Sequence, residues 1–170
     1  YHLSRRPILI NNWEATYFNF TEDQIYKIAE DASKLGIEML VLDDGWFGKR
    51  GDATSGLGDW FVNTKKLPSG LDKFGIWFEP EMISEDSDLF RAHPDWVLRT
   101  AGRQGMLGRC QFVIDMSRKD VVDYLYNSIS SVLRSANIEY FKWDANRQIA
   151  NAWTALLPAE RQGEVMHRYV

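Results

Sequence analysis

The chain has 170 residues, of which 45% are apolar and 26% are charged, with a formal net charge of -4. This length suffices for one domain with a hydrophobic core, and the absence of a basic stripe argues against a nucleic-acid partner. No apolar run approaches the roughly 18 residues of a membrane span, so no membrane partner is expected. The single cysteine, Cys110, excludes an intrachain disulfide and fits a cytoplasmic protein. Aromatic residues make up 14% of the chain, including seven Trp, and flat rings suit the apolar faces of sugars.

The first half of the chain predicts two strands separated by a helix. Residues 7–10 form a short apolar run that ends in polar residues and a tryptophan. Thr21 and Gln24 are spaced as a capping box, which predicts a helix that Gly36 ends. Residues 37–42 are nearly continuously apolar, as expected for a strand that helices cover on both faces.

The second half continues the alternation after a glycine-rich loop. Residues 73–78 and residues 112–115 predict two further strands, and a short helix is expected between them, within residues 84–93. Ser117 begins a longer helix with apolar residues at helical spacing. Residues 138–141 predict a fifth strand, which leads into a charged triplet.

Strands that alternate with helices predict βα units and a parallel sheet. No Gly-x-Gly-x-x-Gly pattern follows any predicted strand, which removes the usual reason for an open nucleotide-binding sheet. Polar and aromatic residues follow every strand instead, as in barrels whose βα loops converge on one site. The predicted fold class is therefore α/β, with residues 1–170 forming the N-terminal part of a (β/α)8 TIM barrel, about its first five βα units.

Carboxylates lie at or just beyond the ends of the predicted strands: Asp43, Asp44, Glu79, Glu81, Asp115 and Asp144. In a barrel these side chains project toward one mouth, the standard position of catalytic groups. Lys142 and Asp144 are two residues apart, so in a strand both point to the same face. An ammonium group there would keep the Asp144 carboxylate ionised, which suits a nucleophile. An ordinary salt bridge at a strand end explains the same pair.

Three other features have both a binding and a structural interpretation. Asp43 and Asp44 can accept hydrogen bonds from neighbouring sugar hydroxyls, and a turn at this position is compatible with that role. A metal site is disfavoured because no His or third oxygen ligand follows at recognisable spacing. Arg109 closes a glycine-rich loop, where it can bind a hydroxyl or carboxylate or simply be solvated. Four tryptophans near strand ends predict a sugar-lined pocket, with core packing as the alternative for each: Trp13, Trp46, Trp60 and Trp77.

Six motifs occur together and in a fixed order: Asn12–Ala15, Leu42–Phe47, Gly58–Trp60, Trp77–Met82, His93–Trp96 and Lys142–Asn146. Each motif alone is weak, but the set is highly specific and spans essentially the whole chain. The set resembles the α-galactosidases of glycoside hydrolase family 36 and, more distantly, the raffinose synthases.

The resemblance implies a retaining hydrolase that releases terminal α-linked galactose from oligosaccharides such as melibiose and raffinose. By this resemblance Asp144 is the nucleophile, and Asp43 and Asp44 bind the 4- and 6-hydroxyls of the sugar. The resemblance implies further substrate-binding side chains at Trp13, Trp77, Arg109, Lys142 and Asn146. It implies no cofactor and no metal, and proteins of the family often form homotetramers.

Two departures from the family pattern have consequences. The family's acid/base carboxyl group lies on a later strand, which would follow Val170, and the flanking β-domains of the family are absent. The chain alone is therefore expected to be nearly inactive. The family also has a crossover helix before the strand that begins near Phe74, whereas here only two residues separate Leu71 from Phe74. About three helical turns of the usual parallel crossover are therefore missing.

Two other classes of function remain open at this point. The first is a different enzyme on the same scaffold, either a raffinose-synthase-like galactosyltransferase or an α-N-acetylgalactosaminidase. The second is an inactive sugar-binding half-barrel.

Overall fold

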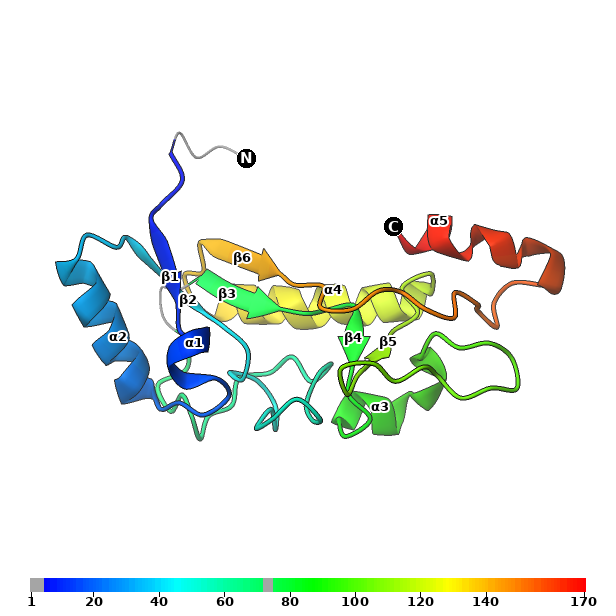
Figure 1. Cartoon of the computed structure of the whole chain (residues 1–170), viewed down its shortest axis with the longest axis horizontal. Coiled ribbons are helices and arrows are strands. Elements are labelled where there is room, and N and C mark those ends of the chain that lie inside the picture. Colours follow the sequence, from blue (N-terminus) through cyan, green and yellow to red (C-terminus); the bar gives the residue numbers. More distant parts are fainter. Residues whose placement is uncertain (1–4, 72–74) are drawn as a thin grey trace.

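The central feature of the fold is a four-stranded parallel sheet (Figure 1). The structure is a computed structural model that describes residues 5–71 and 75–170. The strand order is β1-β2-β3-β6, and every neighbouring pair is parallel. The strands are β1 (Leu9–Asn11), β2 (Met39–Leu42), β3 (Gly75–Phe78) and β6 (Tyr140–Trp143). Parallel strands that neighbour one another in chain order, with helices between β1 and β2 and between β3 and β6, confirm the predicted α/β fold class of a partial barrel.

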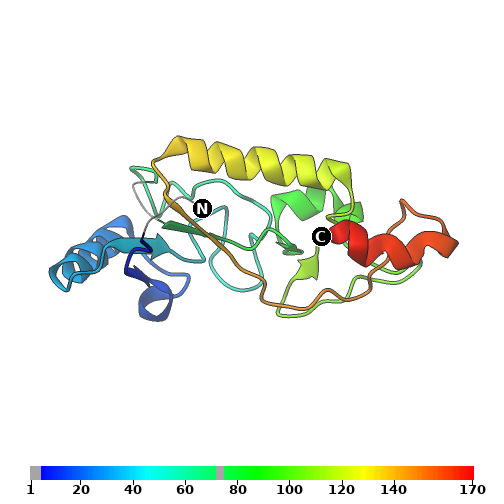
Figure 2. The same ribbon diagram turned by 90° about the horizontal axis from the view of Figure 1, so that it is seen from above.

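The strand expected at residues 112–115 does not belong to this sheet. Its first two residues form β5 (Phe112–Val113), which pairs antiparallel with β4 (Met82–Ile83) in a separate two-stranded ribbon. The predicted number of five parallel strands is therefore wrong for the described residues, which contain four. The next neighbour of β3 is β6, and α4 (Lys119–Ser135) is the helix of the crossover between them. Both views show α4 alongside β3 and β6 (Figure 2).

The helix boundaries follow the local capping chemistry. The capping box predicted for α2 (Glu22–Lys34) is present, because Thr21 and Gln24 exchange side-chain and backbone hydrogen bonds. Ser117 does not cap α4 as predicted, since Arg118 occupies the N-cap and the Ser117 hydroxyl donates to Asp115. The remaining helices are short: α1 (Trp13–Thr16), α3 (Asp88–Ala92), η1 (Pro94–Trp96), η2 (Ala159–Glu164) and α5 (Val165–Tyr169). None of the helices in residues 5–71 and 75–170 is both long and apolar enough to cross a membrane.

The connection between β2 and β3 is irregular where a parallel crossover usually has a helix. Residues 43–71 contain no helix, in agreement with the prediction that the crossover helix is missing, and Phe74 itself lies outside the described residues. Lys66 stabilises this loop by donating to three backbone carbonyl groups. Asp59, in the same loop, accepts the backbone N–H groups of Asp88 and Leu89 and so holds the start of α3.

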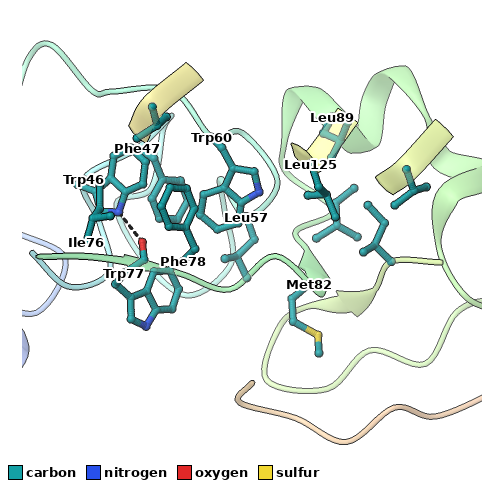
Figure 3. Packing of buried hydrophobic residues seen from close by; sticks show 14 of the residues in the cluster. Trp46, Phe47, Leu57, Trp60, Ile76, Trp77, Phe78, Met82, Leu89 and Leu125 are labelled. Carbon is teal, nitrogen blue, oxygen red and sulfur yellow. Dashed lines mark hydrogen bonds between the residues drawn. The ribbon is translucent and has the colours of Figure 1, made fainter. Parts of the chain in front are cut away.

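The core is an aromatic cluster between this loop and β3 (Figure 3). Trp46 and Phe47 have no exposed surface, and Trp60 is 3% exposed. The rings of Phe47 and Trp60 lie 4.5 Å apart, and the indole N–H of Trp46 donates to the carbonyl oxygen of Trp77 at 2.8 Å. Trp46 and Trp60 are thus core residues, and the prediction that they line a sugar pocket is wrong. Burial of these large apolar rings stabilises the core, and a position near a strand end does not prevent it.

Gly75 allows β3 to lie close to both of its neighbours. A Cβ atom at this position would meet the Val41 side chain at 2.8 Å and the Tyr140 side chain at 3.1 Å. Any larger residue would push β2 or β6 away from β3. The consequence is a tight contact between the strands whose ends carry the candidate site.

Candidate active site

The candidate active site lies at the carboxyl ends of β2, β3 and β6. In the pair β3–β6, Trp77 is opposite Lys142 and Phe78 is opposite Trp143. The backbone N–H of Asp144 donates to the carbonyl oxygen of Phe78 at 2.8 Å, so the ladder continues one residue beyond the strand. Because successive side chains alternate between the two faces of a strand, Lys142, Asp144 and their partner Trp77 share one face.

Asp144 is oriented by donors from both strands. Its Oδ2 atom accepts the indole N–H of Trp77 at 2.8 Å and the side-chain amide of Asn146 at 2.7 Å. Its Oδ1 atom accepts the backbone N–H of Ala145 at 3.0 Å. The ring of Trp77 is 1% exposed and therefore fixed by the core. The predicted site residues Trp77, Asp144 and Asn146 are thus in direct contact.

Lys142 forms its ion pair with Asp43 rather than with Asp144. The ammonium Nζ lies 2.8 Å from Asp43 Oδ2, and the Asp43 side chain is 5% exposed. The other oxygen of Asp43 accepts the backbone N–H of Asp44 at 3.0 Å. Asn12, which has no exposed surface, accepts the Asp43 backbone N–H at 2.8 Å. The interpretation that Lys142 pairs with Asp144 is wrong, since the spacing identified the shared face but not the cross-strand partner.

Asp44 forms a buried ion pair with Arg50. The guanidinium donates through Nε and Nη2 to the two carboxylate oxygens of Asp44, at 3.0 and 2.8 Å. A third donor, Nη1, reaches the carbonyl oxygen of Ser55 at 2.8 Å. Burial raises the pKa of the Asp44 carboxyl group, and the hydrogen bonds and charge of Arg50 oppose that rise. Each carboxylate oxygen keeps a lone pair for a ligand hydroxyl, because an ionised carboxyl group has about four acceptor positions.

The side chain of Lys66 stabilises the turn that follows Asp44. Its ammonium donates to the carbonyl oxygens of Phe18, Gly45 and Arg50, at 2.7 to 2.8 Å. Burial lowers the pKa of Lys66. Gly45 has a φ of 106° and lies against Phe18, whose Cα atom would be 3.1 Å from an added Cβ atom. The two aspartates at the end of β2 therefore sit on a backbone turn that only glycine can complete.

Glu79 lies at the end of β3 and is 2% exposed. Its Oε1 atom accepts the backbone N–H of Asn146 and the side-chain amide of Gln111, both at 2.9 Å. Burial raises the pKa of Glu79 and the nearby charge of Asp144 adds to the rise, whereas the hydrogen bonds from Asn146 and Gln111 oppose it. The Glu79 carboxyl group is thus joined to the segment that follows Asp144.

Trp13 and Arg109 are predicted site residues that lie apart from this hydrogen-bonded cluster. Trp13 begins α1 directly after Asn12, and its half-buried ring packs edge-on against Tyr17 and Phe18. The exposed Arg109 side chain makes no hydrogen bond within the described part of the chain. The other six predicted residues form two hydrogen-bonded groups, Asp43 with Asp44 and Lys142, and Asp144 with Trp77 and Asn146. The two groups are neighbours because Trp77 is opposite Lys142 in the β3–β6 ladder.

Arg109 sits at the tip of a tight hairpin turn. Arg109 and Cys110 have φ values of 52° and 59°, and the flanking Gly108 and Gln111 exchange two backbone hydrogen bonds at 3.1 Å. Two consecutive positive φ values are typical of a type I′ turn. Arg147 donates to the carbonyl oxygen of Gln111 at 2.6 Å, so the hairpin is attached to the segment that follows Asp144.

Four residues that organise the site are hard to predict from the sequence: Asn12, Arg50, Gln111 and Arg147. Each is a lone polar side chain that makes a contact in the site with a residue at least five positions away in the sequence. Asn12 alone had a detectable pattern, since it follows the first strand and precedes Trp13. In residues 5–71 and 75–170 no three His, Cys, Asp or Glu side chains are grouped so that they could hold a metal ion.

Two buried aspartates, an ammonium group and a buried tryptophan thus lie at the carboxyl ends of parallel strands, the position at which barrel enzymes carry their catalytic groups. The sequence model of the melibiase family matches residues 1–170. The chain belongs to this family and is similar along its length to α-galactosidases of glycoside hydrolase family 36.

Individual relatives support the same assignment. The α-galactosidase AgaA of Geobacillus stearothermophilus is 54% identical over 176 residues, which cover 97% of this chain and 24% of AgaA. Mel36A of Lactobacillus acidophilus is 49% identical, with the same shares of both chains. The crystal structure of AgaB from Geobacillus stearothermophilus matches 98% of this chain and 24% of AgaB, with a TM-score of 0.94 and 53% identity. An AgaA variant whose structure contains raffinose matches with a TM-score of 0.93. The chain thus spans about a quarter of these relatives.

Proposed function

We propose that this chain carries the nucleophile and the sugar-binding half of a retaining α-galactosidase site. The observation that carries the proposal is the position of Asp144, held by Trp77 and Asn146 beside the Asp43–Lys142 ion pair. Its substrates would be oligosaccharides with a terminal α-linked galactose, such as melibiose and raffinose. Complexes of AgaA variants with raffinose and stachyose support this substrate class.

In the proposed reaction the Asp144 carboxylate attacks the anomeric carbon of the galactosyl group. The bond from that carbon to the leaving oxygen breaks, and the leaving oxygen takes a proton from a second carboxyl group roughly 5 Å from the nucleophile. Water then attacks the anomeric carbon and gives a proton to the second carboxyl group, which the first step left as a carboxylate; the ester bond to Asp144 breaks and Asp144 is released. Two side-chain donors hold Oδ2, whereas Oδ1 accepts one backbone N–H, so we assign the attack to Oδ1.

The sugar would be held by the groups at the ends of β2 and β6. Asp43 and Asp44 accept hydrogen bonds from its 4- and 6-hydroxyls, and the Lys142 ammonium, whose side chain is 36% exposed, can donate to a hydroxyl. Trp13, Trp77, Arg109 and Asn146 complete the proposed substrate contacts. No cofactor takes part in the proposed reaction.

The test uses a chimera of AgaA in which this chain replaces the matching region, called here the AgaA chimera. We expect the AgaA chimera to hydrolyse p-nitrophenyl α-galactoside. Asp144→Asn should lower its kcat by at least about 10³-fold, because removing a nucleophile removes its whole reaction path. Asp95→Asn, at an exposed carboxylate, is the matched control and should keep full activity.

A second variant identifies the nucleophile chemically. Asp144→Gly with added azide should regain turnover and yield galactosyl azide of the β configuration, because azide enters from the face that Asp144 occupies. A folded but inactive AgaA chimera, or an Asp144→Asn variant with more than a tenth of the parental kcat, would contradict the proposal. We further expect a cytoplasmic homotetramer in the full-length protein, which sedimentation analysis and cell fractionation would test.

A further inference from the structure

We propose that Glu79 is a positioning residue that holds the turn after Asp144 and thereby orients the Asp144 carboxylate for attack. The inference rests on the proposed function and deepens it, since the proposed sugar contacts do not involve Glu79. Glu79 lies at the end of β3, level with Asp144 at the end of β6, because Phe78 is opposite Trp143 in the ladder.

Two short links join Glu79 to Asp144. Glu79 Oε1 accepts the backbone N–H of Asn146 at 2.9 Å, and the side-chain amide of the same Asn146 donates to Asp144 Oδ2 at 2.7 Å. The Glu79 carboxylate thus fixes the backbone of Asn146, and the side chain of Asn146 in turn orients the Asp144 carboxylate. Without the Glu79 acceptor, the Asn146 N–H would lose its partner and the turn would be free to rotate.

Glu79 also joins a second segment to this turn. Gln111 donates to the same Oε1 atom at 2.9 Å, and Gln111 belongs to the hairpin whose tip carries Arg109. A single oxygen therefore receives donors from the hairpin and from the Asp144 turn. Such convergence on a buried carboxylate is typical of a group that fixes the relative positions of its neighbours.

An acid/base role for Glu79 is the alternative, and the geometry disfavours it. A general acid must reach the leaving oxygen directly or through one water molecule. Glu79 is 2% exposed, and its Oε1 atom already accepts two protein donors. A group so enclosed can orient a nucleophile but has no route to the leaving group.

The test compares three variants of the AgaA chimera. Glu79→Ala should lower kcat by about 10- to 100-fold while KM changes little, because a small misplacement of a reacting group costs about 10²-fold in rate. Glu79→Gln should stay within about fivefold of the parent, since its amide oxygen can still accept the Asn146 N–H. Glu85→Gln, at an exposed carboxylate outside the proposed site, is the matched control and should leave both constants unchanged.

Several outcomes would overturn the inference. These are an unchanged kcat in Glu79→Ala, a rise in KM at constant kcat, or an equal loss in Glu79→Ala and Glu79→Gln. If Glu79→Ala does not fold, Glu79→Asp replaces it, because the shorter side chain withdraws the acceptor but keeps the charge. Glu79→Asp should then lower kcat, and full activity of this variant would reject the proposed role.

A measurement that does not depend on activity separates this inference from the proposed function. Hydrogen exchange of the Asn146 backbone amide, followed by NMR in the 170-residue chain, should be at least tenfold faster in Glu79→Ala than in the parent or in Glu85→Gln. Equal exchange rates would contradict the positioning role even if the AgaA chimera is active. Faster exchange in Glu79→Ala, together with an inactive parental AgaA chimera, would instead reject the proposed function alone.

Discussion

The buried ion pair between Arg50 and Asp44 provides the sharpest prediction about stability. We consider Arg50→Met, which keeps an unbranched side chain of similar length but removes the charge and all three hydrogen bonds. The Arg50 and Asp44 side chains are 4% and 9% exposed, so solvent cannot replace the lost partner. Removing one member of a buried pair typically costs about 3–5 kcal/mol, and we expect about 4 kcal/mol at pH 7.

The loss of folding free energy caused by Arg50→Met should increase as the pH rises. Burial raises the pKa of Asp44 above its ordinary value of 3.8, and Arg50 opposes the rise. Without Arg50 the pKa of Asp44 in the folded state rises further, while its value in the unfolded state is unchanged. Between the two values the folded state binds more protons than the unfolded state, so stability falls as pH rises through this interval. The destabilisation caused by Arg50→Met should therefore be larger at pH 7 than at pH 5.

Urea unfolding followed by tryptophan fluorescence measures this effect, because Trp46 and Trp60 are buried in the adjacent loop. Arg91→Met is the matched control, since Arg91 pairs with exposed carboxylates and should contribute less than about 1 kcal/mol. Replacing Asp44 by Asn in the Arg50→Met background should abolish the pH dependence. A cost below about 1 kcal/mol, or one that is equal at pH 5 and pH 7, would refute the argument.

Three further predictions concern the site and the first long helix. The 170-residue chain alone should hydrolyse p-nitrophenyl α-galactoside at less than about a thousandth of the rate of the AgaA chimera, because none of its carboxyl groups is proposed as the acid/base. Equal rates would show that the chain itself contains this group. Lys142→Met should lower kcat/KM of the AgaA chimera about 100-fold through loss of the ammonium at Asp43, whereas Lys119→Met at an exposed pair should not. Thr21→Ala should lower the free energy of unfolding in urea by about 1 kcal/mol, and an unchanged value would contradict the role of the capping box.

Features that depend on neighbouring residues were predicted well from the sequence. The capping box of α2 joins Thr21 to Gln24, three residues apart, so its chemistry is complete within the segment. The alternation of strands and helices also follows from local periodicity, which is why the α/β class was predicted correctly. Contacts between distant segments were predicted less well. Lys142 and Asp43 are 99 residues apart, and their pairing follows from the order of strands in the sheet.

Two errors have the same physical origin. A short apolar run such as residues 112–115 suits either a barrel strand or an antiparallel ribbon, and only its pairing partner decides between them. A tryptophan near a strand end likewise suits either a sugar pocket or a core. Trp46 and Trp60 are core residues because the irregular 43–71 loop packs against β3, a contact that the sequence of the loop alone does not reveal.

Trp77 belongs to the core and to the candidate site at once. Its carbonyl oxygen receives the indole N–H of Trp46, and its own indole N–H reaches Asp144. A substitution that repacks the aromatic cluster therefore also changes the angle at which the proposed nucleophile is held. Attempts to make this protein more heat-resistant through its core would have to be screened by reaction rate as well as by melting temperature, because the two properties share one side chain.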